Sequence, residues 1–367
     1  VPLIVHVPEK FKHLAPPEYG ANATSDRLVS FVDLPPTVLS LAGLKPPAHF
    51  HGHAFMGPND RGPQPYIYGF RGRMDERYDL VRTVRDDRYI YIRNYMPHKI
   101  YGQYIDYMFK MPTVRKWKAM FDNGELTEVQ SRFWRTKPSE ELYDLSQDRD
   151  EIKNLATSPE HQEILRRLRR AQLDLAVRIR DVGFLPEGEM HSRAPNETPY
   201  TLGHDPKRYP MMRILGAAEL ASSNNANAVP TLIGMLKDKD SAVRYWAVLG
   251  LMIRGEAAVQ HGRNLLLPLL SDTASYPRLN AAHALAKHGK PEDLKPAMAV
   301  LLKSASTDHL TVFENLWALN ALDDLGEKVS PWLETIRELR VDLPESYDRR
   351  LKSYAPSLKK AILARFQ

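Results

Sequence analysis

Apolar and aromatic residues in the first part of the chain occur in short runs that are separated by polar turns. Runs rich in β-branched and aromatic residues and bounded by such turns are typical of β-strands. They predict strands over residues 1–7, 66–70, 78–84, 89–95 and 141–145. Strand and helix alternate at first and a strand meander follows, which predicts the edge of an α/β fold joined to a small antiparallel sheet.

Two helices in the same region are indicated by their end signals and by their apolar spacing. Residues 34–43 follow Asp33, carry prolines only in the first turn and end at Gly43, which are ordinary start and stop signals. Residues 159–182 carry apolar side chains at helical spacing, namely Ile164, Leu168, Ala171, Leu175 and Ile179. We expect this second helix to pack on its own domain through that stripe.

Beyond residue 210 the chain becomes helical and repetitive. Arg244 aligns with Arg278 and Gly255 with Gly289, and the members of each pair are 34 residues apart. A period of this length, with small alanines where paired helices would meet, resembles repeats of the HEAT type. The pattern therefore predicts a helical solenoid in the last part of the chain.

The composition is that of a chain with two folded parts. With 367 residues, of which 43% are hydrophobic and 26% charged, the chain is long enough to bury two cores. Residues 183–209 are rich in Pro, Gly, Glu, Ser and Thr, which predicts a linker. We therefore expect an α/β portion over residues 1–182, then this linker, then an all-α HEAT-like repeat domain over residues 210–367.

Charge and missing residue types narrow the range of functions. A net charge of +6 favours anionic partners such as sulfated or phosphorylated ligands. Nucleic acid is disfavoured, because the helical region balances its basic residues with Asp and Glu and shows no stacking motif. No apolar run approaches the roughly 18 residues that span a bilayer. The absence of cysteine excludes disulfides, thiolate zinc sites and a cysteine nucleophile within these residues.

The densest group of charged side chains lies in the loop before residues 78–84. Guanidinium and carboxylate groups are mixed there, in Arg71, Arg73, Asp75, Glu76 and Arg77. Arginine side chains bind carboxylate and sulfate groups through forked hydrogen bonds, so the loop is a candidate anion-binding site. The alternative is an internal network in which the arginines and the acidic side chains hold the loop together.

Several phrases in the first half of the chain resemble, in the same order, the carboxyl-terminal region of a sulfatase. The opening VPLIVHVP and the later VSFVDLPPTVLSLAGL are similar to the stretch that follows the last catalytic segment of such enzymes. The phrases VRTVR, YIRNYMP and ELYDL are similar to the N-sulfoglucosamine sulfohydrolase branch of the family. The chain has no initiator Met and opens inside an expected strand, so we expect it to be the rear part of a longer arylsulfatase-like enzyme.

The resemblance implies an alkaline-phosphatase-like sulfatase fold and hydrolysis of a sulfate ester or a sulfamate. Sulfatases use a formylglycine, made from Cys or Ser in a Cys/Ser-x-Pro-x-Arg phrase, and a calcium ion held by Asp and Asn oxygens. Neither maps onto this chain, because cysteine is absent and the Arg of Ser275-Tyr276-Pro277-Arg278 follows Pro directly. We therefore expect no catalytic and no metal-binding residue here, and no activity from this chain alone.

The resemblance also implies a substrate and a compartment. It places the loop of residues 71–77 near the substrate pocket of the enzyme. Its arginines are then expected to bind carboxylate or sulfate groups of a sulfated small molecule or glycan, and Asp75 and Glu76 to accept from sugar hydroxyls. Such enzymes are usually exported, so we expect a periplasmic or extracellular location. The alternative function is a non-catalytic module that binds a protein partner through its HEAT-like repeats.

Overall fold

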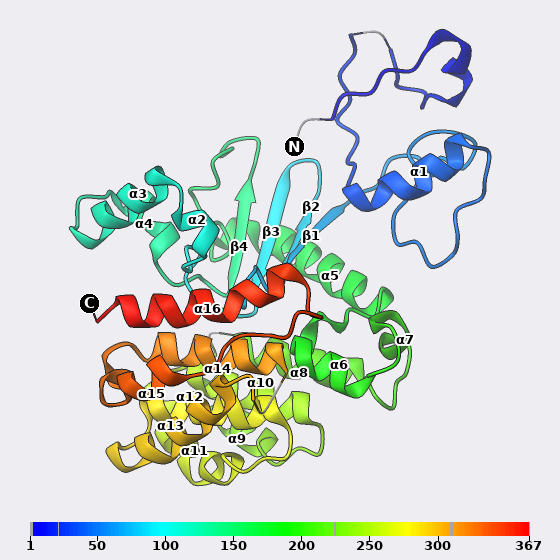
Figure 1. Cartoon of the computed structure of the whole chain (residues 1–367). Helices are drawn as coiled ribbons and strands as arrows, with labels where there is room; N and C mark the ends of the chain where they lie inside the picture. The colour runs from blue at the N-terminus through cyan, green and yellow to red at the C-terminus, as the bar shows by residue number, and fades with distance from the viewer. Residues whose placement is uncertain (1–2, 21, 224, 309–310, 367) are drawn as a thin grey trace. The chain divides into compact units, whose positions relative to one another are not determined.

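The computed structural model describes residues 3–20, 22–223, 225–308 and 311–366, and the chain divides into two compact units (Figure 1). Unit 1 comprises Val1–Phe70, Arg82–Ile92 and Glu140–Ile179. Unit 2 comprises Arg71–Val81, Arg93–Ser139 and Arg180–Gln367. Each unit is therefore assembled from segments that lie far apart in the sequence.

Unit 1 holds most of a four-stranded antiparallel sheet whose strands follow the order β1-β2-β3-β4. The strands are β1 Ile67–Arg71, β2 Val81–Arg85, β3 Tyr89–Asn94 and β4 Glu140–Asp144. They confirm the predicted meander, and three of them match the predicted bounds to within one residue. Strand β2 begins at Val81 rather than at residue 78, because the preceding Tyr78 packs against Trp317 within unit 2.

Helix α5, Gln162–Arg178, covers the sheet and closes the main core of unit 1. That core contains Val84, Tyr89, Tyr91, Leu142, Leu165, Leu168 and Ala171. The predicted helix is confirmed, with a short turn of 3₁₀ helix, η4 Pro159–His161, before it. Of the predicted stripe, Leu168 and Ala171 are buried, whereas Leu175 and Ile179 are only half-buried and Leu165 takes a place in the core.

The segment that precedes the sheet in unit 1 has little regular structure. Its elements are η1 Glu9–Leu14, η2 Phe31–Asp33 and α1 Leu34–Leu41, and α1 confirms the predicted helix, with Gly43 in the left-handed region at φ 73°. The strand predicted over residues 1–7 is wrong for residues 3–7, which carry no strand, while Val1 and Pro2 lie outside the described residues. A strand needs a neighbour for its backbone hydrogen bonds, and the side chain of Ile4 is instead 92% exposed.

Apart from the ends of strands β1, β2 and β3, the regular elements of unit 2 are helices. Its elements are α2 Asp106–Phe109, α3 Pro112–Asp122, α4 Glu128–Ser131, η3 Arg132–Trp134, η5 Val182–Phe184, α6 Glu187–Arg193, α7 Pro199–Gly203, α8 Met211–Ser222, η6 Ala226–Ala228, α9 Val229–Met235, α10 Ser241–Ile253, α11 Glu256–Leu269, α12 Ser275–His288, α13 Pro291–Ala305, α14 Val312–Asp324, η7 Gly326–Trp332, α15 Leu333–Glu338 and α16 Arg349–Ala364. Among the described residues, no helix is both long enough and apolar enough to cross a membrane.

Successive helices of unit 2 pack on one another in a stack that Figure 1 shows from α8 to α16. Helix α10 packs against α8 and α12, α12 against α13 and α14, and α14 against α16. Small residues bring the helices close together, since a Cβ atom on Gly250 would lie 2.9 Å from Cα of Ala221. The predicted helical character of this region is confirmed, and its assignment to HEAT repeats stays a prediction.

The aligned positions of the predicted repeat have surroundings that are equivalent in part. Nη1 of Arg244 donates to the backbone oxygens of Asp238 and Lys239 before its own helix, and Nη1 of Arg278 donates to the aligned oxygens of Asp272 and Thr273. Arg244 also donates a forked pair of hydrogen bonds to the carboxylate of Asp272 at 2.7 and 2.8 Å. Gly255 lies in the left-handed region at φ 83°, whereas Gly289 has φ −72°. The aligned arginines therefore share their contacts at the start of the helix, and the aligned glycines differ in backbone conformation.

Residues 183–209, for which the sequence predicts a linker, are a packed part of unit 2. Phe184 and Leu202 are fully buried there, and Nε1 of Trp246 donates to the backbone oxygen of Phe184 at 2.9 Å. Residues 71–81 and 93–139 also belong to this helical unit. The bounds of the two compact units thus differ from the boundaries predicted at residues 182 and 210, because side chains of these segments pack against the helices of unit 2.

Candidate functional site

The charged loop of residues 71–77 forms a tight turn at the end of strand β1. Met74 and Arg77 exchange two backbone hydrogen bonds, of 2.7 and 2.8 Å, and form an isolated antiparallel bridge. Asp75, at the tip of this turn, has φ 48°. Left-handed backbone is unusual outside glycine but is tolerated by Asp, whose short side chain bonds locally. This turn aims the neighbouring side chains into unit 2.

Arg73 and Asp75 are held by helices from distant parts of the chain. Nε and Nη2 of Arg73 donate to the carboxylate of Glu187 on α6 at 2.5 and 3.2 Å. Oδ1 of Asp75 accepts from the hydroxyl of Tyr354 on α16 at 2.8 Å. Burial by itself would lower the pKa of the Arg73 guanidinium, but the hydrogen bonds and charge of Glu187 raise it above its usual value.

Arg77 and Glu76 are more deeply buried, with 4% and 3% of their surface exposed. Arg77 donates from Nε to the backbone oxygen of Tyr104 at 2.6 Å, and its Nη1 lies 2.8 Å from Oδ2 of Asp323 on α14. Oε1 of Glu76 accepts from the backbone N–H of Asp106 at 2.7 Å. Burial raises the pKa of Glu76. Both side chains thus join the loop to the helices.

Arg71 is the most accessible of the three loop arginines, with 34% of its side chain exposed. Its Nε lies 3.6 Å from Oδ2 of Asp79, which also accepts from Nζ of Lys137 at 2.5 Å. The structure therefore gives all five predicted residues hydrogen-bond or ion-pair partners inside unit 2, which agrees with the alternative considered for this loop. Their role in substrate binding stays a prediction.

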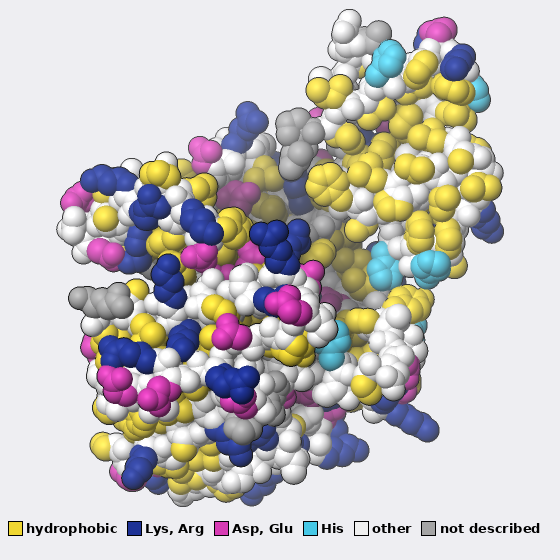
Figure 2. All heavy atoms as spheres, in the orientation of Figure 1, with side chains coloured by type: hydrophobic (Ala, Val, Ile, Leu, Met, Phe, Trp, Pro, Cys, Tyr) yellow, Lys and Arg dark blue, Asp and Glu magenta, His cyan; other side chains and the backbone are white. Residues whose placement is uncertain are grey.

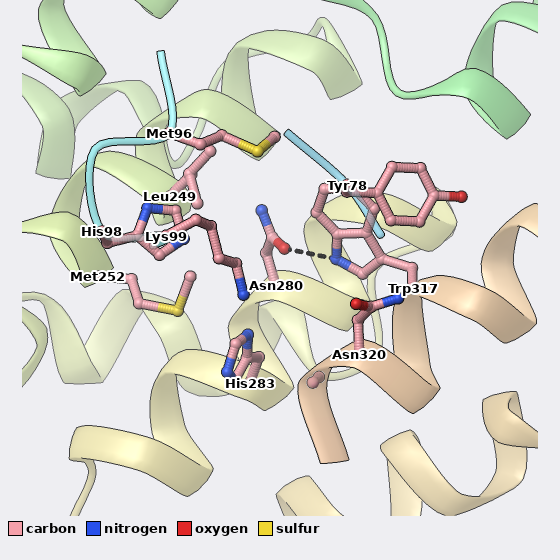
Figure 3. Close-up of a pocket in the computed structure, with 11 residues that line it drawn as sticks. Tyr78, Met96, His98, Lys99, Leu249, Met252, Asn280, His283, Trp317 and Asn320 are labelled. Carbon is pink, nitrogen blue, oxygen red and sulfur yellow. Dashed lines mark hydrogen bonds between the residues drawn. The ribbon is translucent and has the colours of Figure 1, made fainter. Parts of the chain in front are cut away.

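Beside this network, unit 2 contains a small pocket that was not anticipated from the sequence (Figure 3). Its walls come from Tyr78 before β2, from the loop after β3 and from helices α10, α12 and α14. The lining residues are Tyr78, Met96, His98, Lys99, Leu249, Met252, Asn280, His283, Trp317, Asn320 and Ala321. The centre of a water molecule finds about 20 Å³ of space in it, which is room for one or two waters.

One end of the pocket is positively charged. Oδ2 of Asp324 lies 2.7 Å from Nε2 of His283 and 2.7 Å from Nζ of Lys287. Burial raises the pKa of Asp324, but Lys99 and these two neighbours outweigh it and hold that pKa well below its usual range. Burial lowers the pKa of His98 and His283, which favours the neutral imidazoles. The i, i+4 spacing of His283 and Lys287 was the only sequence signal for this cluster.

The resemblance to sulfatases implies a metal site in the complete enzyme. Within residues 3–20, 22–223, 225–308 and 311–366, no group of three or more His, Asp or Glu side chains is placed to hold a metal ion. The chain contains no cysteine to supply a formylglycine. That this chain contributes no calcium ligand and no formylglycine stays a prediction.

Comparison with known proteins relates part of this chain to sulfatases. No family model matches it. It is 37% identical over 210 residues to an ulvan-active sulfatase of Formosa agariphila, covering 56% of this chain and 34% of that protein. A second ulvan-active sulfatase of the same organism is 29% identical over 153 residues, covering 40% of this chain and 28% of that protein. The chain thus spans about a third of the length of these relatives.

A solved structure from Bacteroides thetaiotaomicron with a provisional sulfatase assignment also matches. It is 25% identical and covers 40% of this chain and 24% of that one, with a TM-score of 0.25. The sulfatase relationship of this chain therefore rests on its sequence similarity to the two Formosa proteins.

Proposed function

We propose that this chain is the carboxyl-terminal part of a sulfatase that hydrolyses sulfate esters or sulfamates. The observation that carries the proposal is the 37% identity to an ulvan-active sulfatase over 210 residues. The nucleophile and the calcium ligands of the proposed enzyme lie in polypeptide that precedes Val1. Both Formosa relatives are named for activity on ulvan, and we carry a sulfated glycan over to this chain as the proposed substrate. A periplasmic or extracellular location follows from the same family.

An exposed apolar face on unit 1 supports the proposal that more polypeptide packs there. Thr37 and Ser40 are buried on the inner side of α1. The outer side of α1 and the preceding turn η2 carry exposed apolar residues, with exposed fractions of Phe31 74%, Leu34 37%, Val38 64% and Leu41 38%. Figure 2 shows hydrophobic side chains gathered over α1. Contiguous apolar surface of this kind marks an interaction site, and we assign it to the catalytic part of the same enzyme.

We propose that the loop of residues 71–77 stabilises the wall of the substrate pocket and that only part of the loop contacts the substrate. Arg73 and Arg77 already bind Glu187 and Asp323, so their guanidinium groups are occupied. Arg71 has the most accessible guanidinium, and we propose it as the residue that reaches an anionic group of the substrate. Binding of a protein partner by the helical unit stays a prediction.

The proposal is tested with the gene that encodes this chain and the sequence upstream of it. The upstream reading frame should contain a Cys/Ser-x-Pro-x-Arg phrase, and the complete protein should release sulfate from ulvan, whereas the isolated chain should not. Replacing the Cys or Ser of that phrase with Ala is the matched inactive control. An upstream frame without the phrase, or equal sulfate release by the isolated chain, would refute the proposal.

The assignment of the α1 face is tested with two matched surface substitutions. Val38→Asp places a charge on the proposed interface, and Val129→Asp places one on α4, where the valine is 45% exposed. Neither should change the thermal midpoint of the isolated chain, because both side chains are exposed. In the complete protein only Val38→Asp should lower the midpoint and the activity. Equal effects of the two substitutions would contradict the assignment.

A further inference from the structure

We propose that the pocket of unit 2 binds a small monovalent oxyanion of carboxylate size, with the ammonium group of Lys99 as its counter-charge. This site does not depend on the proposed sulfatase function, because every residue that lines it belongs to this chain. The argument rests on the balance of charges at the pocket, on the hydrogen-bond donors in its wall and on its size.

The protein balances the positive charge of the pocket only in part. Asp324 supplies a carboxylate there, and its Oδ2 is already bound at 2.7 Å by both His283 and Lys287. Lys99 attracts the same carboxylate, but within the described residues its half-buried ammonium group donates no hydrogen bond and has no carboxylate oxygen within 4.0 Å. Two ammonium groups thus face one carboxylate, which leaves a surplus of one positive charge. A partly buried unpaired charge is costly, and a bound anion would remove that cost.

The wall of the pocket offers hydrogen bonds as well as charge. Nε1 of Trp317 donates to Oδ1 of Asn280 at 2.8 Å. This hydrogen bond fixes the orientation of the Asn280 amide, so that its Nδ2 is the atom available as a donor. That nitrogen has only one long hydrogen bond, 3.4 Å to Tyr245, so a second N–H remains for a ligand. Figure 3 shows the Lys99 side chain ending between Asn280 and His283. Nδ1 of His98 is buried without a hydrogen-bond partner among the described residues.

The remaining wall sets the size and strength of binding. Met96, Leu249, Met252 and Ala321 supply apolar surface, and a low local dielectric strengthens an ion pair. The space for one or two water molecules matches an anion with few heavy atoms and excludes a sugar ring. A single surplus charge in such a space favours a monoanion over a dianion such as sulfate.

The experiment uses the present chain and sodium formate, with total ionic strength held constant by sodium chloride. Binding is followed through the single proton signal of formate in ligand-observed NMR. Wild type should bind formate saturably in the millimolar range, more tightly than sulfate. Lys99→Met should weaken binding about tenfold or more, which is the loss of one charge-assisted hydrogen bond. Lys110→Met, at a lysine whose side chain is 72% exposed, is the matched control and should bind as wild type does.

Several outcomes would overturn the proposal. They are the absence of saturable binding, tighter binding of sulfate than of formate, and equal binding by the Lys99→Met variant and wild type. Without formate, Lys99→Met should be at least as stable to heat as wild type, because it removes the surplus positive charge and Asp324 keeps its hydrogen bonds with His283 and Lys287. A strong loss of stability would show that Lys99 has an internal partner and would also overturn the proposal. Lys99→Gln provides the same NMR test with a polar side chain.

Discussion

Replacing Arg77 with Met tests whether the charged loop is held by an internal network. The side chain is 4% exposed and donates to the backbone oxygen of Tyr104 at 2.6 Å and to Oδ1 of Asn320 at 3.1 Å. It also forms an ion pair with Asp323 at 2.8 Å. Met keeps much of the packing volume but none of these hydrogen bonds. The variant therefore leaves a carboxylate, an amide oxygen and a backbone oxygen without their donor.

The expected loss of stability follows from these contacts. Breaking a buried ion pair by removing one partner costs about 3–5 kcal/mol. Asp323 keeps a second partner, because Nη2 of Arg365 lies 3.0 Å from its Oδ1 and its side chain is 16% exposed. We therefore expect the lower end of that range, about 3 kcal/mol. For a unit of this size that loss lowers the thermal midpoint by about 6–12 °C.

Urea unfolding followed by circular dichroism measures the effect, and a double-mutant cycle with Asp323→Asn isolates the ion pair. The matched control is Arg71→Met, since Arg71 lies 3.6 Å from Asp79 and is 34% exposed. The control should cost less than about 1 kcal/mol. A change below 1 kcal/mol for Arg77→Met, together with a coupling energy near zero, would refute the network. A raised KM in the complete enzyme at unchanged stability would instead assign Arg77 to the substrate.

Three further predictions concern other buried groups. Lys137→Met should lower the free energy of unfolding in urea by about 3–5 kcal/mol, because the Asp79 carboxylate loses its buried ammonium partner. Adding Asp79→Leu should restore most of the lost stability, and a double variant as unstable as the single one would contradict this. Burial lowers the pKa of His98 and His283, so the unfolded chain binds more protons below about pH 6.5. The free energy of unfolding should therefore be highest above that pH and fall on acidification. A His98→Gln/His283→Gln variant should show a shallower fall between pH 7.5 and 5.5, and equal slopes for the variant and wild type would disprove the role of these histidines. Gly52→Ala should disorder the segment before β1, measured by limited proteolysis, because its Cβ would lie 1.8 Å from a backbone oxygen; an unchanged cleavage pattern would count against it.

Local rules were sufficient for the elements whose signals lie within a few residues of each other. Helix α1 begins and ends where its prolines and Gly43 predict, and strands β1, β3 and β4 follow their apolar runs. The same rules failed for residues 3–7, since an apolar run becomes a strand only beside another strand. In residues 183–209 the polar composition gave no sign of the buried Phe184.

The sequence alone identified the charged loop and the relationship to sulfatases, but not what the charges contact. The partners of Arg73 and Arg77 are Glu187 and Asp323, which lie more than a hundred residues further along the chain. The pocket likewise joins Tyr78 to helices α10, α12 and α14. Whether an arginine is free or paired depends on which carboxylate the packing of helices brings within hydrogen-bond distance. Tertiary structure decides this, because spacing along a chain carries no information about distances between segments that meet only on folding.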